Sequence, residues 1–124
     1  MKFLIAIMVM FAMKATAEPV HVSTLMLDRT TTGAATAMEM GGVFRTYFAY
    51  GTTTAGAGAC AVKVQVSNDN ASWVDLGTIT LTLATTVAGD GLATTAPWKY
   101  VRGNIGSISG TGAKCSLVVG ATGK

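Results

Sequence analysis

The 124-residue sequence has little charge and almost no histidine or proline. Only 12% of its residues are Asp, Glu, Lys or Arg, and there are one histidine and two prolines. After position 17, seven basic residues face six acidic ones, which leaves a net charge of +1, and the basic residues form no run. The sequence therefore carries no electrostatic footprint for nucleic acid.

The scarcity of reactive side chains bears on catalysis and metal binding. His21 is the single histidine, whereas a catalytic triad needs a base together with an orienting acid. A zinc site typically needs three or four His, Cys or acidic ligands, and the acidic residues lack the spacing of a calcium loop. The glycine-rich stretch 51–59 lacks the Gly-Lys-Ser/Thr ending of a phosphate-binding loop. We therefore expect no catalytic, metal-binding or cofactor-binding residues, and we expect His21 on the surface or at a strand edge.

The most informative stretch of the chain is 60–76. Cys60, Val62, Val64 and Val66 alternate with polar or small residues, which is the period of two of a half-buried strand. Asn, Asp and Asn follow at 68–70, where residues that favour turns cluster. The pattern predicts a β-hairpin whose valines face a core.

The remaining sequence predicts further strands and few helices. Half of the residues are apolar and glycine is abundant, a profile typical of an all-β domain with many turns. Strands are predicted at 20–27, 43–50, 78–83, 98–102 and 114–119, with turns at 103–106 and 110–112 and loops at 28–37, 51–59 and 84–95. We predict one antiparallel β-sandwich or jelly roll of about seven to eight strands, in which those loops and the N-terminal segment make contacts.

Residues 1–17 have the layout of a secretory signal. Lys2 precedes an apolar run over 3–13, and Ala-Thr-Ala at 15–17 has the small-x-small pattern of a cleavage site. The alternative is an apolar arm that stays on the protein and packs against a partner. We expect residues 18–124 to form the β-sandwich domain, with membrane contact only through the N-terminal segment if it is not cleaved.

Cys60 and Cys115 both fall on the apolar side of predicted strands. Export to an oxidising compartment would allow them to form a disulfide. The alternative is two buried thiols, which behave as small hydrophobic residues. Both outcomes stay open at the level of the sequence.

A second group of residues is a candidate contact surface for a sugar or a protein. Tyr47 shares one side of its predicted strand with Arg45, and Trp98, Tyr100 and Arg102 share one side of theirs. Aromatic residues combined with arginine are common in binding surfaces. Trp73 is a further aromatic candidate for this surface. The competing interpretation is ordinary core packing, which we favour for Trp73 and Trp98.

The segments 64–77 (VQVSNDNASWVDLG), 96–105 (APWKYVRGNI) and 108–113 (ISGTGA) resemble small β-rich structural proteins of tailed bacteriophages. Those proteins serve as capsid decoration, cement or head-fibre components. The resemblance covers about half of the chain and implies a non-enzymatic virion protein with no catalytic residues or cofactor.

From the resemblance we expect a homo-oligomer that decorates or stabilises a phage capsid, with the major capsid protein or another virion protein as partner. The alternative is a secreted or cell-surface β-sandwich subunit, either pilin-like or filament-like, or a carbohydrate-binding module. The N-terminal segment favours this alternative, because cleavage of a signal would place the protein outside the cell.

Overall fold

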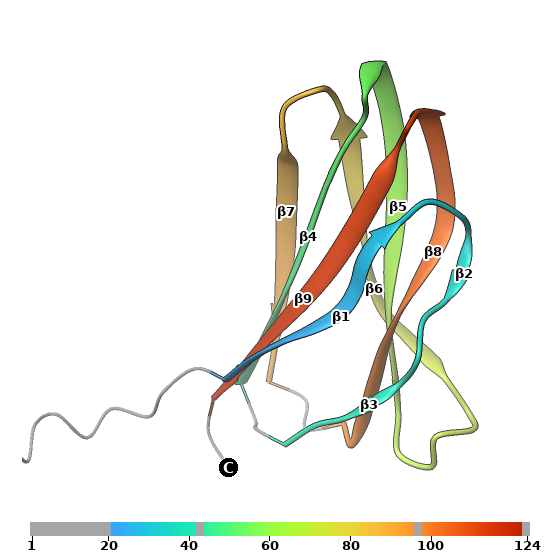
Figure 1. Cartoon of the computed structure of the whole chain (residues 1–124). Helices are drawn as coiled ribbons and strands as arrows, with labels where there is room; N and C mark the ends of the chain where they lie inside the picture. The colour runs from blue at the N-terminus through green and yellow to red at the C-terminus, as the bar shows by residue number, and fades with distance from the viewer. Residues whose placement is uncertain (1–20, 42–43, 96–97, 123–124) are drawn as a thin grey trace, which may run out of the picture.

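The computed structural model describes residues 21–41, 44–95 and 98–122 as two antiparallel sheets packed face to face (Figure 1). The front sheet has the strand order β1-β9-β4-β7, and the back sheet has the order β2-β8-β5-β6, with β3 also paired to β8. Within the described residues the strands are β1 (His21–Arg29), β2 (Gly33–Ala34), β3 (Met38–Glu39), β4 (Phe44–Thr52), β5 (Ala55–Ser67), β6 (Val74–Leu83), β7 (Ala88–Thr94), β8 (Tyr100–Thr111) and β9 (Lys114–Thr122). The prediction of an all-β sandwich is confirmed.

The hairpin predicted from the valine alternation is β5 and β6. Val62 pairs with Ile79, and Cys60 pairs with Leu81 across the hairpin. The apolar side of β5 is buried and its alternate residues remain partly exposed, as the period of two requires. A register shift after Val64 bulges the pair near its turn.

One apolar layer lies between the two sheets. Its back half comes from β5, β6 and β8, and its front half comes from β4, β9 and β1. The fully buried side chains include Val62, Val64, Val66, Leu83, Val101, Ile105, Leu117 and Val119. β-branched and aliphatic side chains of this kind fill the gap of about 10 Å between stacked sheets.

Four segments predicted as loops or turns contain strand residues. The predicted loop 28–37 contains the end of β1 and all of β2, and the predicted loop 51–59 is largely the start of β5. The predicted loop 84–95 contains β7, and the turn predicted at 103–106 lies inside β8. These segments consist mainly of Gly, Ala, Ser and Thr, so they carry no hydrophobic period from which a strand could be recognised. Pairing with neighbouring strands on the sheet makes them extended.

Gly103 shows why a glycine sits inside a strand of this sandwich. It lies on the inward side of β8, and a Cβ there would stand 2.8 Å from Met26 Sδ and 2.9 Å from a Leu117 methyl group. Side chains of the front sheet already occupy that space. The glycine allows the close approach of the two sheets.

The N-terminal segment and the proposed domain boundary at residue 18 lie outside the described residues. Within the described ranges, no helix is long and apolar enough to cross a membrane.

We predict that Gly103→Ala lowers the free energy of unfolding by about 1–3 kcal/mol, because the added methyl group overpacks the core against Met26 and Leu117. Urea unfolding followed by tryptophan fluorescence measures the change. Gly106→Ala on the same strand is the matched control. The nearest atom to its new Cβ would be Cε of the flexible Lys63 side chain at 3.3 Å, and the Ala61 carbonyl oxygen would lie at an ordinary contact distance of 3.9 Å. Equal effects of the two substitutions would contradict this explanation.

Candidate interaction surface

The outer side of the front sheet, which we call the front face, is uncharged over its central part. Directly paired residues of neighbouring strands point to the same side of a sheet, so the register defines its members. The twelve central positions are Val22 and Thr24 on β1, Val118, Gly120 and Thr122 on β9, Phe44, Thr46, Phe48 and Tyr50 on β4, and Gly89, Gly91 and Ala93 on β7. Each of these is apolar, glycine, or a hydroxyl-bearing residue without formal charge. At one end the same alternation continues to Thr52, Ser116 and the charged Lys114.

Strand β4 forms an aromatic ridge along this face. Phe44 is 57% exposed and Phe48 is 48% exposed, unusually high values for residues of this size. The Phe48 ring stacks on Tyr50 at 5.8 Å between centroids. It also lies over Gly89 of the adjacent strand, where a Cβ would collide with the ring. The ridge is therefore supported by the sheet beneath it.

A hollow of about 590 Å³ opens beside the ridge. Its lining consists of Phe44, Arg45, Thr46, Ala93, Thr94, Thr95, Gly120 and Thr122. A second hollow lies next to it, around Phe48 and Gly91. The depressions form because the residues of β7 and β9 on both sides of β4 have small side chains or none, so no side chain fills the space beside the phenylalanines.

The sequence-based choice of Arg45 and Tyr47 as surface residues is wrong. The two side chains share one side of β4, as predicted, but that side faces the interior: Arg45 is 2% exposed and Tyr47 is 1% exposed. The phenylalanines take the outer side instead. Ala49 and Gly51 follow on the inward side, and such small residues were the signal in the sequence that this side meets another layer closely.

Burial gives Arg45 and Tyr47 an unusual environment. Arg45 Nη2 donates a hydrogen bond to the Met40 carbonyl at 2.9 Å. Among residues 21–41, 44–95 and 98–122, Arg45 Nε, Arg45 Nη1 and the Tyr47 hydroxyl have no hydrogen-bond partner. Burial raises the pKa of Tyr47, and the neighbouring Arg45 guanidinium opposes this shift. The two side chains are thus buried polar groups inside the sandwich and do not form a contact surface.

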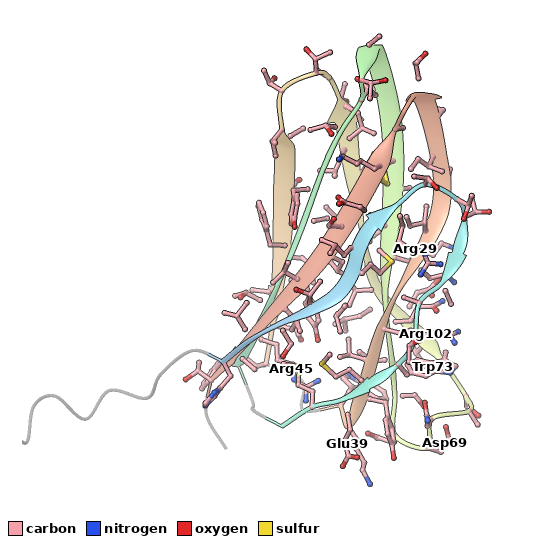
Figure 2. The ribbon with its side chains drawn as sticks, viewed as in Figure 1. Arg29, Glu39, Arg45, Asp69, Trp73 and Arg102 are labelled. Carbon is pink, nitrogen blue, oxygen red and sulfur yellow. A yellow bond between two sulfur atoms is a disulfide. The ribbon has the colours of Figure 1, made fainter. Side chains whose placement is uncertain are left out.

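The other predicted contact residues lie on a different sheet. Tyr100 and Arg102 are half-buried on the outer side of β8, and Trp98 packs partly against the core, as expected for it. Figure 2 shows Arg102 next to Trp73 and away from Arg45. The structure thus does not bring the five predicted residues together.

The outer side of the back sheet is polar and internally hydrogen-bonded. Arg102 stacks on the Trp73 ring at 4.2 Å and donates from Nε to Gln65 Oε1 at 2.8 Å. Gln65 Nε2 donates to Asp75 Oδ1 at 2.8 Å, and Lys63 approaches Asp75 at 3.9 Å. Lys63 is thus paired with Asp75, and Arg102 is held by Gln65 and Trp73, in contrast to the uncharged centre of the front face. Trp73 lies under Arg102 and outside the hydrophobic core, so the expectation of core packing is wrong for it.

Cys60 of the back sheet and Cys115 of the front sheet are joined as a disulfide. Both residues are buried, and their Cα atoms lie 6.9 Å apart. Of the two outcomes that the sequence left open, the structure has the cross-link. It ties the two sheets together directly beneath the front face.

The turn of the β5–β6 hairpin is closed by Asp69. Its Oδ1 accepts hydrogen bonds from the Ala71 amide, the Ser72 amide and the Ser67 hydroxyl at 2.8–2.9 Å. These bonds hold the pKa of Asp69 well below its usual range, because they stabilise the charged form. Asp69 is therefore a turn-forming residue, as the sequence suggested.

His21 is exposed at the start of edge strand β1, which confirms its predicted position. In the part of the chain that the structure describes, no group of three or more His, Cys, Asp or Glu side chains is arranged to hold a metal ion.

Comparison with known proteins adds little to this description. The sequence matches no protein-family model and no curated protein. A similar solved structure is that of the PBSX exported protein XepA, with a TM-score of 0.47 and 12% sequence identity. The alignment covers 86% of this chain and 38% of XepA, so the chain spans well under half the length of that protein. Similarity at this level supports no assignment of function.

We predict that replacing both cysteines, Cys60→Ala with Cys115→Ala, lowers the free energy of unfolding by about 4 kcal/mol, because the cross-link closes a loop of 55 residues in the unfolded chain. Denaturant unfolding without reductant measures the loss. Reductant should destabilise the wild type by a similar amount and leave the double variant unchanged. A wild type that is insensitive to reductant after unfolding and refolding would contradict the prediction.

We predict a pH-dependent contribution from Asp69. Because its pKa is lowered on folding, its stabilising effect is present above the unfolded value of about 4 and is lost as the pH falls below it. The difference in melting temperature between wild type and Asp69→Ala should therefore be constant near neutral pH and shrink in acid. Asp90→Ala in β7 is the control, since the Asp90 carboxylate accepts a hydrogen bond from the Gly91 amide at 2.8 Å and lies away from the hairpin turn. A difference that grows in acid would contradict the assignment.

Proposed function

We propose that this protein is a non-enzymatic structural component of a virion, which decorates or stabilises a phage capsid by burying its front face in a protein–protein contact. The observation that supports the proposal is the front face, which is uncharged over its central part and exposes Phe44 and Phe48. The proposal also agrees with the resemblance of residues 64–77 and 96–105 to phage structural proteins.

The energetics of the front face favour its burial. Phe44, Phe48 and Val22 are each about half exposed or more, and covering apolar surface is worth about 25 cal/mol per Å². Extended apolar patches on a soluble protein mark sites of association. Because the twelve central positions of the face carry no charged group, their burial does not require the desolvation of an ion.

The scaffold is suited to a structural role. The front sheet packs on the hydrophobic core, and the Cys60–Cys115 disulfide links it covalently to the back sheet. A rigid face loses little conformational entropy when it binds, which favours a stable contact over a transient one. The partners of this proposal are the major capsid protein, another virion protein, or further copies of the chain, and its location is the virion.

A second candidate function is an exported β-sandwich subunit on the cell surface or in the medium. The disulfide favours it, because disulfides persist in oxidising compartments outside the cytoplasm. The signal-like residues 1–17 agree with export. Intact-mass measurement of the native protein separates the candidates: loss of residues 1–17 supports export, and their retention supports the virion component.

The proposal predicts that the purified protein sediments with empty shells of the phage that encodes it. Phe48→Asp should weaken this binding at least about tenfold, because a carboxylate would be desolvated in the contact. Quantitative co-sedimentation at micromolar protein measures the effect.

Val74→Asp is the matched control. Val74 is 51% exposed, close to the value for Phe48, but it lies on β6 of the back sheet. It should bind shells like the wild type. Wild-type protein that stays in the supernatant would overturn the proposed function.

A further inference from the structure

We propose that the front face is the contact between two copies of this chain, which pack front sheet against front sheet in a symmetric dimer. The inference rests on the proposed function and names the partner that covers the front face. Four features of the described residues support a second copy as the occupant: charge, shape, sheet geometry and area.

The distribution of charge suits an identical partner. In a two-fold contact each residue meets itself or a near neighbour from the other copy, so a charge near the centre would meet the same charge. The front face has none over its twelve central positions. Its charged residues, Lys114 opposite Thr52 and Asp28 beside Ser116, stand together at one end of the sheet. A partner of different sequence is usually matched by complementary charge, and the central positions offer no charge to match.

The relief of the front face is complementary to itself. The ridge of Phe44 and Phe48 stands between depressions floored by Gly91 and Ala93 on one side and by Gly120 on the other. When two such faces meet, the ridge of one copy can enter the hollow beside the ridge of the other. Aromatic side chains seated in pockets are the groups that contribute most to binding.

Sheet geometry permits the contact. Two sheets pack face to face when their strand directions lie within about 30°, an angle that arises from the twist that each sheet already has. Two copies of one sheet carry the same twist. The dimer would repeat, between molecules, the type of contact that the two sheets of one molecule already make.

The area is near the lower limit for a specific dimer. Three strands of nine residues and one of seven, spaced about 4.8 Å apart with a rise of about 3.3 Å per residue, cover roughly 540 Å² over their full length. Two copies together then bury roughly 1,100 Å², before the relief of the side chains is counted, which lies just above the roughly 1,000 Å² expected of a biological interface.

The test is the mass of the full chain in solution without any shell, measured by sedimentation equilibrium from about 1 to about 100 µM. The wild type should be a dimer. Phe48→Asp should raise the dimer dissociation constant at least about tenfold, and Val74→Asp should change it less than about twofold. Thr46→Lys, at an exposed strand position, provides a second disruptive variant that adds like charges across the contact.

Thermal unfolding of each variant confirms that it is folded. A folded wild type that remains monomeric at the highest concentration would overturn the dimer. If that monomer still binds shells through Phe48, the proposed function stands and only the partner of the front face is wrong. If a dimer forms but does not bind shells, the dimer stands and the proposed function fails.

Discussion

Exclusion of water from the layer between the two sheets is the interaction on which the rest of this structure depends. Neither sheet could stand alone, since each has a full row of apolar side chains on its inner side. The layer is thin at Gly103, where Met26 and Leu117 fill the space that a side chain would need. The Cys60–Cys115 bond crosses the same layer. Packing and covalent linkage thus fix the distance between the sheets together.

With the interior fixed in this way, the two outer sides of the sandwich have opposite chemistry. The back sheet satisfies its own charges through the Gln65 network and the stacking of Arg102 on Trp73. The front sheet presents Phe44 and Phe48 beside bare glycines. A side whose polar groups are already paired gains little from a partner, whereas an exposed aromatic ridge gains a great deal. This asymmetry, rather than any single residue, supports a role in assembly.

The sequence was sufficient where side chains alternate strongly. The valines of β5 and the Ile and Leu residues of β6 specify their strands and their inward side without ambiguity, and Asp69 marks the turn between them. It was insufficient where side chains are small: β7 and the first residues of β5 have no hydrophobic period, so only their pairing with neighbours makes them strands. The local pattern also could not predict which side of β4 faces the core. Both of its sides carry aromatic residues, and the more hydrophobic one faces outward, because Ala49 and Gly51 fit against the other layer.

The pairing of β1 with β9 joins the first described strand to the last one. In the front sheet β9 also lies between β1 and β4 (Figure 1). The front sheet therefore closes through pairing between strands that lie far apart in the sequence, and such long-range pairing slows folding. Gly120 and Thr122 of β9 line the hollow beside Phe44, so this hollow forms only when β9 has taken its place next to β4.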